Sequence, residues 1–584
     1  MKTCIATGLI LLLLTVLAVA DTAPTVRFDQ TLVRFDSESM MVRYADFQTL
    51  AVGHRLVLPS VTRYIRLTDP TRVPMISTLV PSGPVIGSVS ADDLRDIPTS
   101  DAALTYLDYD RLISDRPGTQ PVEVIDRITI GETTYLRLSV TPVSVDTDGR
   151  LTFNGEIFVY LDGALLESSR LLTAEQLPVT TDKERYSSTT ADGAGVIKYL
   201  IVTSPALIDA CQLLADYKNS TGINTEVVSI NDILAGQTGR DDAEKLRNYL
   251  KDFYTDRGIY LLLAGDETQL PIRYAYPNSA YSMPPLAEQQ ICDLYFGDLT
   301  GEWDVDNDGV WGEKYIDQAD LTPELYVGRL PFSTADEMGR YVDKLIRYET
   351  DPGGGDAGYV ENVFFFSSDQ MRDYGTIGQH GLVAEAFGDN FAVDTANGVE
   401  YASGEDPNPT NIAADEVEPI LDQGYGVVNI ISHGSYSTFG VRTSGYNDWP
   451  KSYFTTDNSL SEHGLIDRLT PNHNSALYYS VGCDNGAFDM DQPPFNQTNR
   501  NLVEALLALE SAGAVAFVAN SRWGWVGASH YLHKAFFDSL WAHPDRPAVA
   551  AMYASKAAYY YYRDLAYGQN FYGDPTLRIY SQTP

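Results

Sequence analysis

Two apolar stretches of the sequence each lead into a residue that can do chemistry. Residues 427–431 lead to His433, and residues 477–481 lead to Cys483. Both stretches have the composition of buried strands, and in a parallel sheet the carboxyl ends of the strands gather ligands and catalytic groups. The pattern therefore predicts that the imidazole and the thiol lie together at one edge of a sheet.

This pair of residues predicts the chemistry of a cysteine peptidase. The thiolate is the reactive form of cysteine, and a free thiol has a pKa of about 8.5. A neighbouring imidazole can take the thiol proton and later give it to a leaving amine. We therefore predict Cys483 as nucleophile and His433 as general base, with the N–H groups of Gly434 and Cys483 as oxyanion donors and proteins or peptides as substrates. A small buried cysteine without reactivity is the alternative.

An acidic loop predicts a calcium site. Its carboxylates alternate along the chain before a glycine, and oxygen ligands at positions one, three and five are typical of calcium loops. Crowded carboxylates repel one another unless a cation neutralises them, which favours a structural calcium ion over a bare acidic turn. The glutamate comes at position ten, so the loop is not a regular EF-hand. The expected ligands are Asp304, Asp306, Asp308, Val310, Glu313 and Asp317.

The sequence pattern divides the chain into four parts. Residues 1–20 are typical of a signal peptide, because Lys2 precedes an apolar run and a small-x-small cleavage site, so we expect a secreted protein. Residues 21–185 are rich in β-branched and aromatic residues and predict a β-rich domain. Strand and helix patterns alternate over 186–352 and again over 353–584, which predicts an α/β fold with parallel sheets flanked by helices.

Composition excludes two classes of partner and a disulfide scaffold. The net charge is -38, from 41 Lys and Arg against 79 Asp and Glu. Because phosphate contacts need clustered basic side chains, we expect neither nucleic acid nor a membrane as a partner. Only Cys211, Cys292 and Cys483 follow the signal segment, so at least one thiol stays free or pairs between chains.

Several segments, in this order, resemble the gingipain family of caspase-like cysteine peptidases. The 50 residues from His433 to Cys483 are also similar to the caspase order of histidine before cysteine. The resemblance runs from Ile197 to Tyr580 and implies a caspase-like α/β fold in two subdomains behind a β-rich pro-domain. The segments that carry it are 433–434, 482–486, 262–266, 326–331, 344–349 and 571–575.

The resemblance also implies roles for further residues. Family members orient the histidine with an acidic residue after the first strand of the second subdomain, and Asp369 matches that position. The substrate pocket maps to Ile377, Val481 and Gly482. Arginine-specific members carry an acidic residue where this chain has Ile377, so the specificity stays open, with Asp373 as a nearby substitute.

We therefore expect a secreted cysteine endopeptidase made as a zymogen, whose own N-terminal domain is a partner removed by a cut near Arg185. Two alternatives stay open. A sortase-like transpeptidase of a secretion system would use the same thiolate and resolve the acyl-enzyme with an amine. A calcium-stabilised, non-enzymatic surface or adhesion protein would keep the fold without the activity. No organic cofactor is expected.

Overall fold

The computed structural model divides the chain into two compact units, and each is described by itself. The N-terminal unit comprises Met1–Asp96, Tyr109–Thr190 and Tyr315–Asp320, and the C-terminal unit comprises Ile97–Asp108, Ala191–Lys314 and Leu321–Pro584. The structure describes residues 25–37, 40–44, 48–52, 56–68, 76–81, 83–90, 94, 120–130, 133–146, 148–161, 171–173, 176–177, 199–254, 259–278, 283–314, 316–369, 371, 380–381, 383–387, 391–398, 411–442, 452–459, 463–559 and 562–579.

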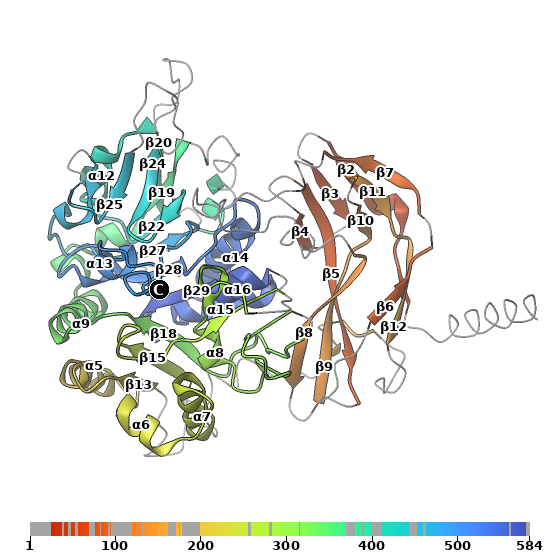
Figure 1. Cartoon of the computed structure of the whole chain (residues 1–584). Coiled ribbons are helices and arrows are strands. Elements are labelled where there is room, and N and C mark those ends of the chain that lie inside the picture. The colour runs from red at the N-terminus through yellow and green to blue at the C-terminus, as the bar shows by residue number, and fades with distance from the viewer. Residues whose placement is uncertain are drawn as a thin grey trace, which may run out of the picture. The chain divides into compact units, whose positions relative to one another are not determined.

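The described part of the N-terminal unit is built mainly of strands, most of them paired antiparallel (Figure 1). One sheet has the order β2-β3-β5-β9-β8 with β4 on β5, and two smaller sheets have the orders β1-β12-β6 and β10-β11-β7. The β-rich domain predicted in front of the α/β region is thereby confirmed. The strands are β1 (Thr25–Arg27), β2 (Val33–Asp36), β3 (Met41–Tyr44), β4 (Gln48–Val52), β5 (Leu56–Arg66), β6 (Ile76–Leu79), β7 (Val85–Ser88), β8 (Val122–Ile130), β9 (Thr133–Val140), β10 (Val143–Val145), β11 (Arg150–Phe153) and β12 (Glu156–Leu161).

The turn between β10 and β11 shows how local sequence determines the backbone conformation in this unit. The Oδ1 atom of Asp146 accepts hydrogen bonds from the N–H groups of Asp148 at 3.0 Å and Arg150 at 2.9 Å. Gly149 closes the turn with a φ of +77°, where an L side chain is disfavoured. Leu151 and Phe153 then point into an apolar core, so the strand alternates between buried and more exposed positions.

The C-terminal unit is built on one 11-stranded sheet of order β14-β13-β15-β18-β29-β28-β27-β22-β19-β20-β21 (Figure 1). The predicted boundary at residues 352 and 353 falls inside this unit, and the strands before and after it share the sheet. Its strands are β13 (Tyr199–Thr203), β14 (Thr225–Ser229), β15 (Tyr260–Ala264), β18 (Tyr326–Leu330), β19 (Asn362–Ser367), β20 (Ala392–Gly398), β21 (Asn411–Ile412), β22 (Val427–Ile431), β27 (Ala476–Ser480), β28 (Ala514–Asn520) and β29 (Gln569–Gly573).

Short strands and helices surround this sheet, which confirms the α/β class. The short strands are β16 (Tyr274–Ala275), β17 (Gln290–Ile291), β23 (Gly434–Ser435), β24 (Thr438–Arg442), β25 (Ser452–Thr455) and β26 (Gly464–Leu465). The helices are α5 (Ile208–Ser220), α6 (Ile230–Gly236), α7 (Asp242–Tyr254), α8 (Leu294–Gly297), α9 (Ala335–Thr350), α12 (Val417–Leu421), α13 (Leu502–Ala508), α14 (Ala528–Ala542), α15 (Ala548–Ala558) and α16 (Arg563–Gly568).

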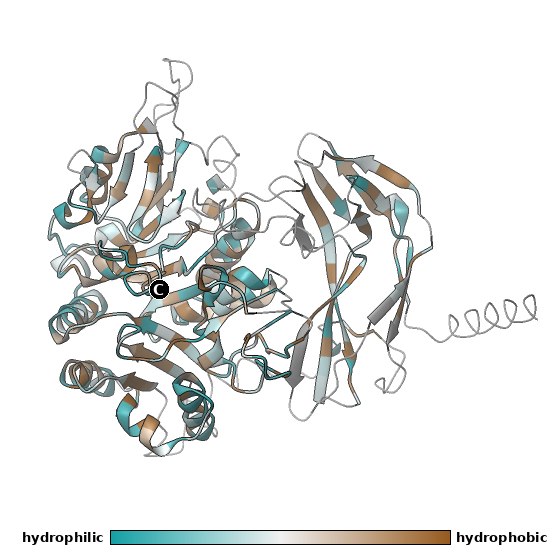
Figure 2. Cartoon of the chain, in the orientation of Figure 1, coloured by the Kyte–Doolittle hydropathy of each residue, from teal (hydrophilic) through white to brown (hydrophobic). Residues whose placement is uncertain are grey.

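Burial explains why these segments form strands and helices. Every residue of β22, β27 and β28 is buried, as expected for strands covered on both faces. Figure 2 colours the same strands by hydropathy and shows hydrophobic residues along the sheet. Helix α9 begins with a capping box of Thr334 and Glu337 and buries one face, with Tyr341 and Leu345 inside. None of the helices in the described part of the chain has the length and apolar character needed to cross a bilayer.

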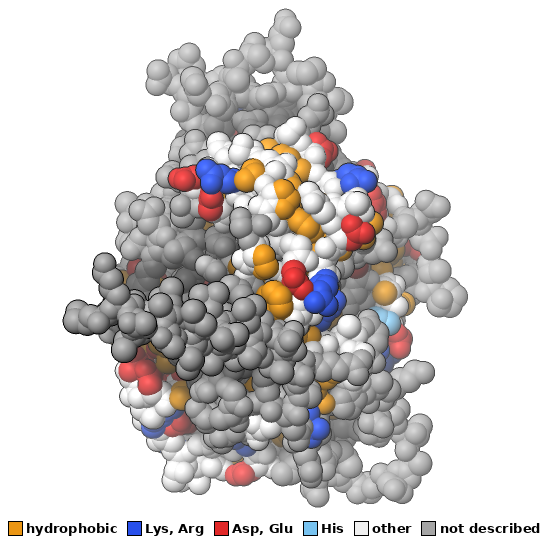
Figure 3. Space-filling model, turned by 90° about the vertical axis from the view of Figure 1, so that its right-hand side faces the viewer, with side chains coloured by type: hydrophobic (Ala, Val, Ile, Leu, Met, Phe, Trp, Pro, Cys, Tyr) orange, Lys and Arg blue, Asp and Glu red, His pale blue; other side chains and the backbone are white. Residues whose placement is uncertain are grey.

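The charged side chains on one face of the molecule are dispersed. On the face in Figure 3, Lys and Arg side chains lie apart from one another, several of them beside Asp or Glu, and among the residues described they form no continuous basic band.

Candidate active site

Three neighbouring parallel strands carry the predicted catalytic residues just past their carboxyl ends. Strand β22 pairs with β27 so that Ile430 lies opposite Ser480, and His433 and Cys483 each follow three residues later. On its other side β22 pairs with β19, with Ile431 opposite Ser367, and Asp369 follows two residues later as His433 does. The shared register therefore brings all three predicted residues to one edge of the sheet.

The backbones of the His433 and Cys483 segments are in direct contact. A Cβ atom added to Gly434 would lie 2.4 Å from the carbonyl oxygen of Cys483 and 3.0 Å from its nitrogen. A Cβ atom added to Gly482 would lie 3.2 Å from the Cα atom of Gly434. Real Cβ atoms essentially never come within 3.0 Å of a backbone atom, so the approach of the two segments requires glycine at position 434.

Asn485 ties the two segments together through its side chain. Its Nδ2 atom donates to the carbonyl oxygens of Ser435 and Thr438, each at 2.9 Å, just after the histidine. Its Oδ1 atom accepts a hydrogen bond from the Ser480 hydroxyl at 2.7 Å, just before the cysteine. Asn485 is fully buried, so these bonds fix the relative position of the two segments.

The Cys483 sulfur receives a backbone hydrogen bond that the sequence analysis did not find. The N–H of Gly524 donates to Sγ at 3.1 Å, and the Cys483 thiol donates to the Gly524 carbonyl oxygen at 3.5 Å. The carbonyl can pair only with the thiol, whereas the N–H donor aimed at sulfur stabilises the thiolate. Gly524 follows β28, so its segment also lies past the carboxyl end of a strand, where catalytic groups are expected. A glycine has no side chain, however, that would indicate a role for its N–H.

The remaining predicted site residues lie in different environments. Val481 and Gly482 are buried in the segment that leads to Cys483, and His433 is buried too. Asp369 is buried as well and interacts electrostatically with Arg442: burial lowers the pKa of Arg442, and Asp369 raises it. Ile377 lies outside the described residues, as does the expected cleavage position Arg185.

The acidic loop brings carboxylates together as a cation site requires. Carboxylate oxygens of Asp306, Asp308 and Glu313 lie within 4.8 Å of one another, and Glu313 is fully buried. Such a set of hard oxygen donors fits calcium. Asp304 already has a partner, because its Oδ2 atom lies 2.7 Å from Nη1 of Arg240.

Val310 and Asp317 are the two remaining expected ligands. The N–H of Val310 donates to Oδ1 of Asp308 at 2.7 Å, which shapes the turn after Gly309 at φ +84°. Asp317 is buried and belongs to the segment Tyr315–Asp320, which groups with the N-terminal unit.

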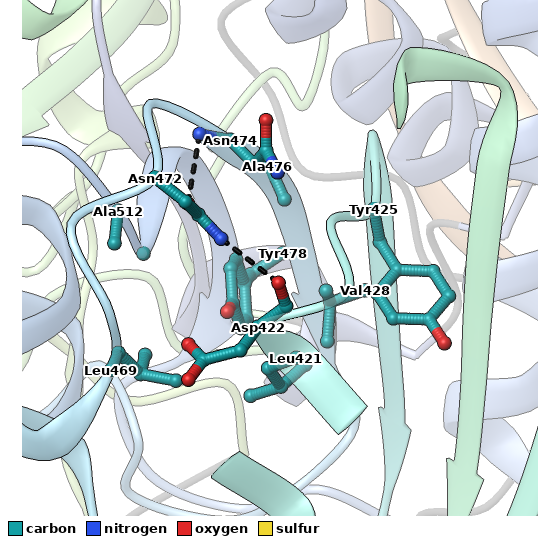
Figure 4. A pocket seen from close by; sticks show the side chains of 11 residues that line it. Leu421, Asp422, Tyr425, Val428, Leu469, Asn472, Asn474, Ala476, Tyr478 and Ala512 are labelled. Carbon is teal, nitrogen blue, oxygen red and sulfur yellow. Dashed lines mark hydrogen bonds between the residues drawn. The ribbon is translucent and has the colours of Figure 1, made fainter. Parts of the chain in front are cut away.

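A small pocket lies at the opposite edge of the sheet (Figure 4). Val428 and Ala476 line it near the starts of β22 and β27, and Asn472 donates to the Asp422 carbonyl oxygen at 3.1 Å. Its volume of about 10 Å³ leaves room for roughly one water molecule, so it is not a substrate site.

Comparison with known proteins gives a family for the C-terminal part of the chain. The model of peptidase family C25 matches residues 193–580. The chain is similar to the crystal structure of the Arg-specific cysteine proteinase gingipain R, at 18% identity and a TM-score of 0.47, over 67% of this chain and 80% of that one. It is also similar to the complex of RgpB pro- and mature domains from Porphyromonas gingivalis, at 17% identity and a TM-score of 0.47, over 65% and 79% of the two chains. No curated protein matches the chain.

Proposed function

The chain belongs to peptidase family C25 and is a cysteine peptidase, and on this premise we propose that it is a secreted endopeptidase, made as a zymogen, with Cys483 as nucleophile and His433 as general base. The family assignment confirms the resemblance seen in the sequence. The observation that carries the residue assignment is the contact between the two segments: Gly434 packs on the backbone of Cys483, and Asn485 bonds to both segments.

The proposed reaction has two stages. His433 takes the proton of the Cys483 thiol, and the sulfur attacks the carbonyl carbon of the scissile bond. The N–H groups of Gly434 and Cys483 stabilise the oxyanion, and His433 gives its proton to the leaving amine as the C–N bond breaks. His433 then deprotonates a water molecule, which attacks the thioester and releases the acid and the thiolate.

Other residues support this reaction in the proposal. The Gly524 N–H stabilises the thiolate between turnovers, since it already lies 3.1 Å from the sulfur. Asp369 orients His433 from the neighbouring strand end, and Val481 and Gly482, with Ile377, form the substrate pocket. Proteins and peptides are the substrates, and the residue preferred before the cut bond is left open.

The zymogen proposal is supported by the order of the two units along the chain, since a β-rich unit precedes the segment that matches family C25 at residues 193–580. We propose that cleavage near Arg185 releases the N-terminal domain and activates the peptidase. Export follows from the signal segment at residues 1–20.

A structural calcium ion completes the proposal. Asp306, Asp308 and Glu313 would hold it, with Asp304, Asp317 and the Val310 carbonyl as further ligands. When bound, calcium neutralises the clustered carboxylates and stiffens the loop. Calcium should raise the melting temperature of wild type, and Glu313→Gln should reduce that rise, whereas the exposed Asp415→Asn should not. An equal rise in all three proteins would contradict the site.

The function is tested with Cys483→Ala beside wild type. Both are incubated with a peptide library and a thiol-directed acyloxymethyl ketone probe, before and after proteolytic removal of the N-terminal domain. We expect labelling and hydrolysis only in cleaved wild type. Product that forms only with an added amine would instead indicate a transpeptidase, and hydrolysis by Cys483→Ala would refute the nucleophile.

A further inference from the structure

The segment after the nucleophile is paired with the segment after β28. The N–H of Asp484 donates to the Arg522 carbonyl oxygen at 2.7 Å, and the N–H of Gly486 donates to the Asn520 carbonyl oxygen at 2.9 Å. The pairs run in opposite directions along the two segments, like a short antiparallel ladder. Asp484 enters it with a φ of +55°, so the chain reverses sharply right after Cys483.

Arg522 also holds the far end of this turn through its side chain. Its Nη1 and Nη2 atoms lie 3.0 and 2.7 Å from Oδ1 and Oδ2 of Asp489, a paired geometry that fits guanidinium to carboxylate. Asp489 accepts a further hydrogen bond from the Tyr274 hydroxyl at 2.8 Å. Arg522 is fully buried and Asp489 is 2% exposed, so the pair is shielded from water.

The same arginine stands two residues before the group that meets the sulfur. The segment 520–524 carries the Asn520 and Arg522 carbonyls, which accept from the turn, and then the Gly524 N–H, which donates to Cys483. A shift of this segment moves the N–H away from the sulfur. One side chain therefore fixes both the turn that presents the thiol and the donor that faces it.

We propose that Arg522, paired with Asp489, is a positioning residue that holds the Gly524 N–H against the Cys483 sulfur and so sets how readily the thiolate forms. This inference rests on the proposed role of Cys483 as nucleophile. Arg522 touches neither the sulfur nor the substrate in this proposal and acts through the Gly524 N–H.

The electrostatics of the pair agree with a permanent charge on Arg522. Burial lowers its pKa, but Asp489 raises it further, so the net shift is upward. Asp484 faces the same guanidinium: burial raises the pKa of Asp484 to about 7, and Arg522 lowers it. The arginine is thus the cation between two buried acids at the base of the turn.

A second buried pair gives a matched control. Arg329 is fully buried and places Nε and Nη2 2.8 and 2.6 Å from oxygens of Asp293, which is 3% exposed. Removing this arginine creates the same kind of unpaired buried carboxylate. Its hydrogen bonds do not involve residues 482–486 or 520–524.

The test compares Arg522→Met, Arg522→Lys and Arg329→Met with wild type. After proteolytic removal of the N-terminal domain, alkylation of Cys483 by iodoacetamide is followed by mass spectrometry across pH, beside kcat and KM for a peptide. Cys211 and Cys292 do not interfere, because burial raises the pKa of each thiol to about 12.

We expect the alkylation midpoint of Arg522→Met to rise by about one pH unit and kcat to fall about tenfold with KM within about twofold, as for the loss of one hydrogen bond to a charged group. Arg522→Lys keeps the charge without the paired geometry, so its alkylation midpoint and its kcat should lie between those of wild type and Arg522→Met. Arg329→Met should lose stability and keep the wild-type midpoint.

A folded Arg522→Met with the wild-type midpoint and kcat would overturn the positioning role. So would an equal shift in Arg329→Met, which would mark the effect as general loss of packing. If Arg522→Met does not fold, the alkylation midpoint and kcat of Arg522→Lys test the positioning role instead. Full hydrolysis by Cys483→Ala would instead refute the proposed function, and the alkylation midpoints would still report on Arg522.

Discussion

Two groups of buried titratable side chains lie in the C-terminal unit, and burial shifts their pKa values in opposite directions. Burial raises the pKa of Asp484, the residue after the nucleophile, to about 7 and that of the half-buried Glu267 to about 8. Near helix α14, burial lowers the pKa of His380 to about 3 and that of His530 to about 4, and it lowers the pKa of His533 well below its usual value.

The second group, which we call the histidine cluster, consists of His380, His530, His533 and Asn429. The registers of β19, β22 and β27 place Phe365, Asn429 and Tyr479 side by side. The His380 ring lies 5.0 Å from that of Phe365, and the His533 ring stacks on Tyr479 at 4.6 Å. Among the described residues, both ring nitrogens of His380 and His533 and both polar side-chain atoms of Asn429 have no hydrogen-bond partner.

Because of this difference, lowering the pH changes the stability contributed by the two groups in opposite directions. Protonation neutralises the buried carboxyls and favours the folded state, whereas it charges the buried imidazoles and opposes the folded state. Below pH 6.5 the two contributions offset each other. The pH dependence of wild-type stability therefore does not reveal either contribution, and variants of single residues are needed to measure each of them.

The largest expected effect is that of Asp484→Asn. The folded-state pKa of Asp484 is about 7, against 3.8 for the free side chain, so its charge destabilises the folded state increasingly as the pH rises from about 4 to 7. Asparagine stays neutral and also tolerates a positive φ. The variant should match wild type at pH 4 and exceed its unfolding free energy by roughly 4 kcal/mol at pH 8.

Denaturant unfolding across pH measures this gain, and the exposed Asp545→Asn serves as the control with no pH-dependent change. A gain that is already complete at pH 4 would contradict the assignment, because it would not come from titration of Asp484.

The next largest effect is that of His533→Phe, which keeps an aromatic ring on Tyr479. Because the folded-state pKa of His533 lies well below 6.5, stability is full above pH 6.5 and is lost as the pH falls, while the unfolded chain takes up the proton. The variant lacks this loss. Its unfolding free energy relative to wild type should rise by about 3 kcal/mol between pH 6.5 and 4.

The exposed His543→Phe, just past the end of the same helix, is the matched control. Parallel pH curves for wild type and His533→Phe would refute the buried neutral state of this imidazole.

How much of the site could be predicted follows from what each residue contributes. His433 and Cys483 were predicted because reactive side chains follow apolar strands, and the structure places both segments at one sheet edge. Gly524 contributes a backbone N–H, which every residue except proline has, so its identity carries no chemical sign of this role. The Asn485 side chain bonds to carbonyls about 50 residues earlier, a contact that local patterns do not contain.

The fold, like the site, could be predicted only in part from the sequence. The alternation of strands and helices predicted the α/β class, and the break near residue 352 predicted two halves. Strand β29, close to the end of the chain, lies between β18 and β28 and so joins the halves into one sheet. The histidine cluster was missed for the same reason, since His380 and His533 lie 153 residues apart in the sequence.

The smallest expected effect is that of Asn429→Leu, which changes stability in the histidine cluster without changing a titratable group. Asn429 is fully buried, and neither polar atom of its side chain has a hydrogen-bond partner among the described residues, which costs desolvation free energy at every pH. Asn429→Leu keeps a similar volume and removes both polar atoms, so it should stabilise the protein by about 1–2 kcal/mol equally at pH 8 and pH 5. Unfolding measured at the two pH values checks this. A loss of stability would mean that bound water satisfies the amide, and a pH-dependent change would mean that Asn429 acts through the neighbouring imidazoles.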